Sequence, residues 1–244
     1  MKLLQRFLSY LFLSVLVACT PRVMQAELQG LEPFILTPLP QEQRYIIAVP
    51  NFSVRAGSVR IAGQGLEQED TFYKQLGSGL ADIFVSEAFR SQQFRITERA
   101  ELDKVLYEQD LAASGRIDPS TAASLGKITG AELLVLGSLS EFGVSITGGG
   151  GGVFGIFSGA AERVNVRISV DIRLVDATTA EILAIGYATA EASQGNIKID
   201  ILNVLKDLQA GQSGTSVIDL AVRNAIIGAI NSAARHLPPK IPNL

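Results

Sequence analysis

Residues 163–174 have the sequence Arg-Val-Asn-Val-Arg-Ile-Ser-Val-Asp-Ile-Arg-Leu, in which polar and apolar side chains alternate without a break. Successive side chains of a β-strand point to opposite faces, so this period of two predicts a strand with one apolar and one polar face. The run has 12 residues, whereas an average strand has about 5–6 and a bilayer-spanning strand about 9–11. Every charge in the run lies on the polar face. The segment therefore fits either a long strand of a half-buried sheet or a strand of a membrane barrel.

The two faces of this strand predict different surroundings for alternate residues. In the membrane interpretation the apolar face contacts lipid, because a lipid-facing Arg costs about 2–4 kcal/mol at the bilayer midplane. Residues 142–146 alternate in the same way, so they extend both faces to a second strand. The predicted lumen-facing residues are Arg163, Asn165, Arg167 and Ser169. The predicted lipid-facing residues are Val164, Val166, Ile168, Phe142, Val144 and Ile146. An antiparallel sheet with one solvated face has the same period, so both interpretations stay open.

The chain begins with the features of a secretory signal. Two basic residues precede an apolar stretch, residues 7–17, which is too short to span a bilayer. The stretch ends in Leu16-Val17-Ala18-Cys19, which resembles a bacterial lipobox. Cleavage there makes Cys19 the N-terminus, and several acyl chains on it give stable membrane anchoring. The residue after the cysteine is Thr20, and the absence of Asp at this position resembles lipoproteins sorted to the outer membrane. An ordinary cleaved signal with a coincidental cysteine is the alternative.

The composition offers few residues for enzymatic or metal chemistry. The 24 acidic residues outnumber the 21 basic ones, and the basic residues do not cluster, so nothing indicates a nucleic-acid partner. Cys19 is the only cysteine and His236 the only histidine, which leaves little for nucleophilic catalysis or a zinc site. The five glycines 148–152 lack the lysine of a phosphate-binding loop. We expect no enzyme activity, no metal and no cofactor besides the lipid on Cys19.

Before residue 138, strands alternate with helices, which predicts an α/β layer. Several short motifs follow one another over roughly residues 44–235, namely Phe94-Arg95-Ile96-Thr97-Glu98-Arg99, Leu106-Tyr107-Glu108-Gln109, residues 130–138, residues 149–156 and residues 170–183. Taken in this order, they resemble the CsgG/HfaB family of outer-membrane lipoproteins for curli production.

The resemblance implies a periplasmic α/β domain (α+β in the broader classification) with two β-hairpins contributed to an oligomeric transmembrane β-barrel. A ring of protomers, a nonamer in the type member, closes the barrel and exports unfolded amyloid subunits together with curli-type accessory proteins. The implied segments are a lipoprotein signal peptide (1–18), a lipidated tether (19–43), the first part of the periplasmic domain (44–137), a first transmembrane β-hairpin (138–172), periplasmic strands (173–185), a second transmembrane β-hairpin (186–215), and a C-terminal helix and tail (216–244). Within 201–208 the pattern fits a helix as well as a strand.

The family narrows its pore with a loop between the first strand and the first helix, here residues 55–73. Phe72 is the best positional match to the family's aromatic residue, and Tyr73 lies beside it. The matching amide is not evident, although Gln64 and Gln68 are candidates. The alternative for Phe72 is a packing role at the start of the helix.

A second class of function uses a similar α/β domain without a pore. In that reading the second half of the chain folds as a soluble sheet. The protein would then be a periplasmic outer-membrane lipoprotein that binds and regulates a cell-envelope partner such as a peptidoglycan synthase.

Overall fold

The computed structural model divides the chain into two units, Met1–Leu31 and Glu32–Leu244, and all elements below belong to the second. The predicted signal peptide and Cys19 lie outside the part of the chain that the structure describes. That part comprises residues 31–61, 70–99, 101–118, 120–121, 128–147, 161–197, 201–211 and 216–240.

The elements follow the predicted order of a mixed α/β domain. The strands are β1 (Tyr45–Ala48), β2 (Ser53–Val54), β3 (Val59–Ile61), β4 (Phe94–Ile96), β5 (Leu133–Thr147), β6 (Ala161–Asp176) and β7 (Ile182–Ile197). The helices are η1 (Gln41–Gln43), η2 (Ala56–Ser58), α3 (Asp70–Ser91), α4 (Leu102–Ala113), α5 (Ile201–Gln209) and α6 (Val217–His236). The alternating run 163–174 lies inside β6, so the prediction of a long strand is confirmed.

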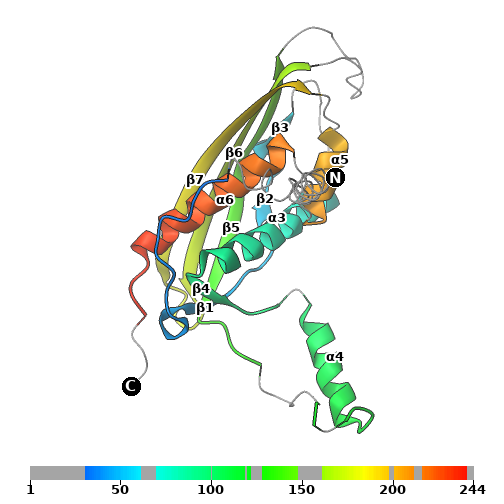
Figure 1. Cartoon of the computed structure of the whole chain (residues 1–244), viewed down its shortest axis with the longest axis vertical. Helices are drawn as coiled ribbons and strands as arrows, with labels where there is room; N and C mark the ends of the chain where they lie inside the picture. The colour runs from blue at the N-terminus through cyan, green and yellow to red at the C-terminus, as the bar shows by residue number, and fades with distance from the viewer. Residues whose placement is uncertain are drawn as a thin grey trace, which may run out of the picture. The chain divides into compact units, whose positions relative to one another are not determined.

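All seven strands form one sheet, with β4-β1-β5-β6-β7 as its main path. β5, β6 and β7 are antiparallel and 15 or 16 residues long, whereas β1 pairs in parallel with both β4 and β5. β2 and β3 also pair with β5, on the same side as β1 but further along that strand. The helices α3, α5 and α6 lie on one face of this sheet (Figure 1). We call this face the inner face and the opposite one the outer face.

The core lies between the inner face and these helices. α6 is 20 residues long, and its N-cap Ser216 accepts a hydrogen bond from the backbone N–H of Asp219 at 3.1 Å. Small residues let α6 approach β7 closely: a Cβ added to Gly186 would lie 2.2 Å from the carbonyl oxygen of Ala229. Among the described helices, α6 is long and apolar enough to cross a membrane, but 67% of its most apolar window is buried. It is the central core helix of this domain.

Two predicted segments differ from expectation. The sequence left 201–208 open between strand and helix, and the structure forms α5 there, so the predicted second hairpin has β7 but no return strand among the described residues. The loop expected over 55–73 contains η2 and β3, and α3 already begins at Asp70. The first outcome settles what the sequence left open, and the second corrects the expected loop; in both cases the segment packs into the core against neighbours that the local pattern does not reveal.

The later part of the predicted tether is bound to the domain. The side chains of Asn224 and Asn231 on α6 accept hydrogen bonds from the backbone N–H groups of Glu32 and Ile35 at 2.8 and 3.2 Å. Asn231 also donates to the carbonyl of Pro33 at 3.0 Å. Residues 32–35 of the predicted tether (19–43) are therefore hydrogen-bonded to α6. The 13 steps along the chain from Cys19 to Glu32 can span at most about 45 Å.

Candidate functional site

The apolar face of the long strands is the inner face of the sheet. Five of the six residues predicted to face lipid are at most 3% exposed and belong to the core shared with the helices, and Ile146 is half-buried beside them. The fully or nearly fully buried members are Phe142, Val144, Val164, Val166 and Ile168. In this structure they pack in one core with residues of α3, α5 and α6, and their contact with lipid stays a prediction.

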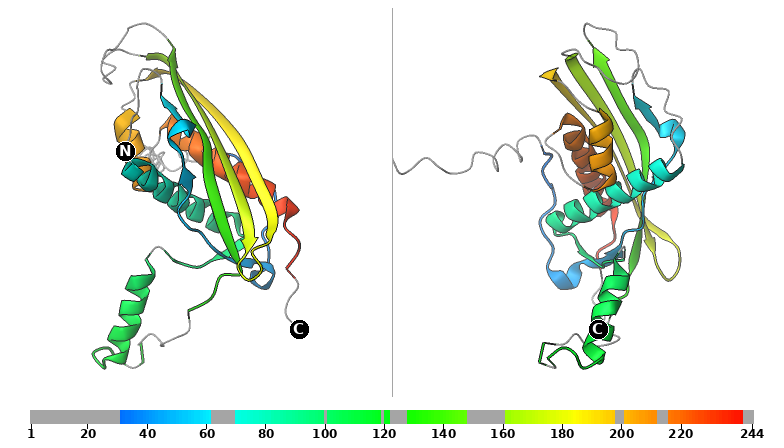
Figure 2. Two further views of the ribbon diagram at one scale, coloured as in Figure 1. Left: turned by 180° about the vertical axis from the view of Figure 1, so that it is seen from behind. Right: turned by 90° about the vertical axis from the view of Figure 1, so that its right-hand side faces the viewer.

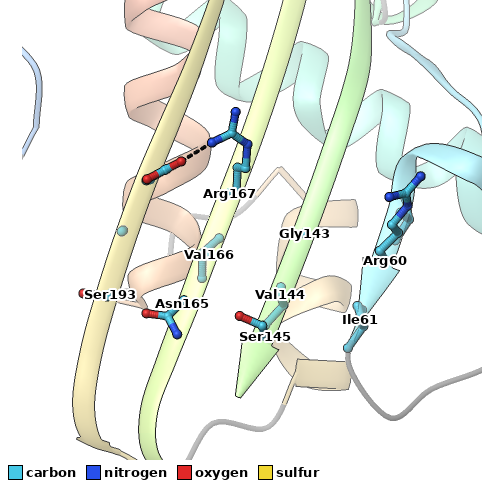
Figure 3. Close-up of a pocket in the computed structure, with 12 residues that line it drawn as sticks. Arg60, Ile61, Gly143, Val144, Ser145, Asn165, Val166, Arg167 and Ser193 are labelled. Carbon is cyan, nitrogen blue, oxygen red and sulfur yellow. Dashed lines mark hydrogen bonds and ion pairs between the residues drawn. The ribbon is translucent and has the colours of Figure 1, made fainter. Parts of the chain in front are cut away.

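The polar face of the same strands is the outer face, and it carries the candidate site. A groove of about 860 Å³ lies there, where β3, β5, β6 and β7 run side by side (Figure 3). Of the predicted lumen-facing residues, Arg163 and Arg167 are exposed and Asn165 and Ser169 are half-buried. Their placement on the face opposite the apolar residues is confirmed. Contact with an aqueous lumen stays a prediction.

Cross-strand pairing places Arg167 at the centre of the groove. Its Nε donates to a carboxylate oxygen of Glu141 on β5 at 3.0 Å, and its Nη1 donates to a carboxylate oxygen of Glu191 on β7. These carboxylates raise the pKa of the Arg167 guanidinium further above its ordinary value. The Ser169 hydroxyl extends the network, because it bonds to Glu141 at 3.3 Å and to the Thr189 hydroxyl at 2.8 Å. The network links all three long strands through groups that stay in water.

A second arginine lies on the same row of the sheet. Arg60 on β3 is in register with Gly143, which in turn is in register with Arg167 (Figure 3). Because Gly143 carries no side chain, it leaves open space between the two guanidinium groups. Arg60 is exposed, and the structure shows no ion pair for it among the described residues.

The sequence missed the partners in this row. Glu141 and Glu191 lie on polar positions of their alternating segments, but only the strand register brings them to Arg167. No sequence pattern pointed to Arg60, because the segment before α3 was expected to be a loop.

The predicted constriction residues lie inside the first turn of α3. Tyr73 is buried in the core, and its ring meets the Phe72 ring edge-on with 5.3 Å between centroids. The backbone carbonyl of Phe72 accepts a hydrogen bond from Gln209 of α5 at 3.3 Å. This placement fits the alternative packing role, since both residues hold α3 to its neighbours. A pore-narrowing role for Phe72, whose side chain is half-buried, stays a prediction, and Gln64 and Gln68 lie outside the described residues.

Two kinds of side chain bear on catalysis or metal binding, the single histidine and the carboxylates. His236 lies in the last turn of α6, where its Nδ1 is 2.8 Å from the carbonyl oxygen of Ser232. Within the described residues, no three His, Cys, Asp or Glu side chains gather in a way that would hold a metal ion.

The long strands also leave one edge of the sheet open. β7 pairs with β6 on one side, and in the described part of the chain no strand pairs with its other side. An unpaired edge presents a row of backbone N–H and C=O groups that can pair with another chain. The site is thus a polar outer face that ends in an open edge of 16 residues.

Comparisons with solved structures return distant likenesses. The lipoprotein GNA1162 from Neisseria meningitidis is 14% identical, with 67% of this chain and 93% of that one covered and a TM-score of 0.33. Protein XCC0632 from Xanthomonas campestris is 11% identical over 82% and 93% of the two chains, with a TM-score of 0.39. The PelC dodecamer from Paraburkholderia phytofirmans is 12% identical over 81% and 92%, with a TM-score of 0.30. No protein with a curated description matches the chain.

A protein family gives the decisive match. The family described as curli production assembly/transport component CsgG matches residues 29–241. The match covers every helix and strand described above, including the long antiparallel strands and α6. The chain therefore belongs to the CsgG family.

Proposed function

We propose that this chain is a lipid-anchored subunit of a ring-shaped outer-membrane secretion channel, which exports unfolded protein subunits of the curli type or anchors a surface adhesin. The family match over residues 29–241 supports a role in assembly or transport. The lipid on Cys19, which the lipobox predicts, would anchor such a subunit, and the 13 steps of chain to Glu32 would keep the domain within about 45 Å of the bilayer. The proposed role is transport and binding, without catalysis.

The observation that carries the proposal is the open edge of β7. In the described part of the chain, β7 is an edge strand of 16 residues with a strand on one side alone, and such an edge is a liability for a monomer because it pairs readily with other chains. If β7 of each copy pairs with the opposite edge of the next copy's sheet, the contact is head-to-tail. A closed ring of such contacts leaves no open edge. The same strands exceed the about 9–11 residues that a bilayer-spanning strand needs.

The outer face suits the wall of an aqueous path. Around the groove it presents Arg163, Arg167 and Glu191 to water, and Arg167 is paired with the carboxylates of Glu141 and Glu191. In this part of the outer face an unfolded chain would meet mainly polar side chains, to which its apolar residues would adhere weakly.

A second candidate function has its own support. The inner-face residues Val164, Val166 and Ile168 are covered by helices of the same chain, as in the soluble sheet of a partner-binding module. In the channel, lipid instead of these helices must contact the inner-face side chains near the ends of the long strands. In the module, the helices stay where they are and the protein regulates a cell-envelope partner.

Ring formation and labelling distinguish the two candidates. The full lipidated protein, purified in detergent, should show rings by negative-stain electron microscopy and conduct ions in a planar bilayer. In membranes, Val166→Cys should react with a lipid-phase probe and Asn165→Cys, its neighbour on the opposite face, with a water-soluble maleimide. A particle without rings, or a Val166→Cys thiol that resists both probes, would refute the channel and favour the module.

A further inference from the structure

Helix α4, which we call the arm, lies apart from the sheet and from the other described helices. Figures 1 and 2 show α4 away from the sheet and from the other helices in every view. Val105, Leu106 and Tyr107 on this helix are 41%, 40% and 68% exposed. A helix of 12 residues is marginal in water without packing, and Glu101 at its N-cap makes no side-chain capping bond. Gln109 of α4 is buried, whereas these three side chains are exposed and available to a partner.

A matching apolar patch lies on the outer face of the sheet, at the opposite edge. Leu136 on β5 is 37% exposed, and Ile185 and Tyr187 on β7 are 54% and 71% exposed. Strand register places Leu136, Arg173 and Ile185 side by side in one row across β5, β6 and β7. We call these residues, together with Tyr187, the outer patch.

The arm is acidic, whereas arginines outnumber carboxylates around the outer patch: Arg55 and Arg173 lie there with one acid, Asp171, which is in register with Tyr187. Three exposed carboxylates, Asp103, Glu108 and Asp110, lie on α4, and its lysine is already paired with Glu101 at 2.5 Å. Beside the outer patch is a groove of about 670 Å³ that Arg55 and Arg173 line. No carboxylate is among the described residues that line this groove.

The positions of the two surfaces decide which chain supplies the partner. The arm follows β4, which is one edge of the main sheet, and the outer patch reaches β7, which is the other edge. A helix that extends past one edge meets the outer patch of a neighbouring copy aligned beside it. Such a contact uses different surfaces on the two copies, so it repeats from copy to copy and closes when the rotation permits.

We propose that α4 of one copy docks on the outer patch of the next copy, with Val105 and Leu106 against Leu136 and Ile185, and with the α4 carboxylates beside Arg173. The contact rests on the proposed ring and names a second interface for it, separate from pairing at the β7 edge. Docking covers the exposed side chains of the helix and removes both exposed apolar surfaces from water.

Disulfide crosslinking of the full lipidated protein tests this contact. The native cysteine is the predicted acylation site, so each introduced cysteine reports alone. Copies with Leu106→Cys and copies with Ile185→Cys should give crosslinked dimers when the two are produced together, and neither alone should. The double variant should give a ladder of dimers, trimers and larger species. Ser193→Cys is the matched control, because Ser193 is exposed on the same face of β7 but far from the outer patch; with Leu106→Cys it should give none.

Two further measurements keep the outcomes distinct. Val105→Cys with Tyr187→Cys repeats the test in case one variant fails to fold, which circular dichroism would reveal. Electron microscopy of the wild-type protein reports the ring independently. Rings without crosslinks for either pair would overturn the arm contact and leave the channel proposal intact. Crosslinks within one chain, or equal crosslinking of the Ser193→Cys control, would also overturn it.

Discussion

Replacing Arg223 with leucine should destabilise the domain by about 3 kcal/mol, because it leaves a buried carboxylate with only one cation. Glu87 on α3 has a fully buried side chain, and one of its oxygens lies 2.5 Å from the guanidinium of Arg223 on α6, whose side chain is 14% exposed. The other oxygen pairs with Arg90, which is 43% exposed. Removing one partner of a buried ion pair costs about 3–5 kcal/mol. Because Arg90 still compensates part of the charge, the low end applies.

Thermal and urea unfolding of the purified protein, at one fixed protein concentration, measures this loss. For a domain of 150–250 residues, 1 kcal/mol corresponds to about 2–4 °C, so Arg223→Leu should lower Tm by about 6–12 °C. Arg90→Leu is the matched control and should cost less than Arg223→Leu, because Arg90 is 43% exposed and water already screens part of its interaction with Glu87.

The double variant Glu87→Leu/Arg223→Leu completes the cycle. It should recover part of the lost stability, since it removes the buried Glu87 carboxylate together with its partner, whereas Asp219, which Arg223 also contacts at 3.2 Å, still loses that arginine. If Arg223→Leu costs no more than Arg90→Leu, or if the double variant is less stable than both single ones, the reasoning about buried charge between α3 and α6 is wrong.

Three further changes have expected outcomes. Gly79→Ala should lower Tm by several degrees, because the new Cβ would lie 1.6 Å from the backbone oxygen of Leu208, whereas Gly57→Ala, with open space around it, should leave Tm almost unchanged. Asp176 accepts two backbone N–H bonds of 2.8 Å that lower its pKa, so it stabilises the folded state above its ordinary pKa and loses this effect as the pH falls through the lowered value. Asp176→Asn should therefore reduce stability at neutral pH and weaken the acid dependence of unfolding; an unchanged acid limb would contradict this. Cys19→Ser should move the protein out of the outer-membrane fraction and abolish labelling with a radioactive fatty acid, and unaltered fractionation would refute the lipobox.

The sequence alone determined the long strand and its two faces. The alternation in residues 163–174 requires extended backbone, since only a period of two keeps every charge on one side. The short strand at residues 94–96 and the long C-terminal helix were also predictable, because their apolar spacing matches one type of element. Ordered short motifs were sufficient to indicate the family.

Only the tertiary structure decided what covers the apolar face of that strand. A period of two shows that Val164 and Val166 avoid water, but lipid tails and the side chains of α6 are equally apolar, so the pattern is the same for both. Residues 201–208 were ambiguous for a related reason, because a short apolar run fits a buried helix as well as a strand. The ion pair between Glu87 and Arg223, 136 residues apart, and the outer patch opposite α4 depend on strand order and helix packing. Contacts between segments that are distant along the chain arise only when the sheet forms, so no local pattern encodes them.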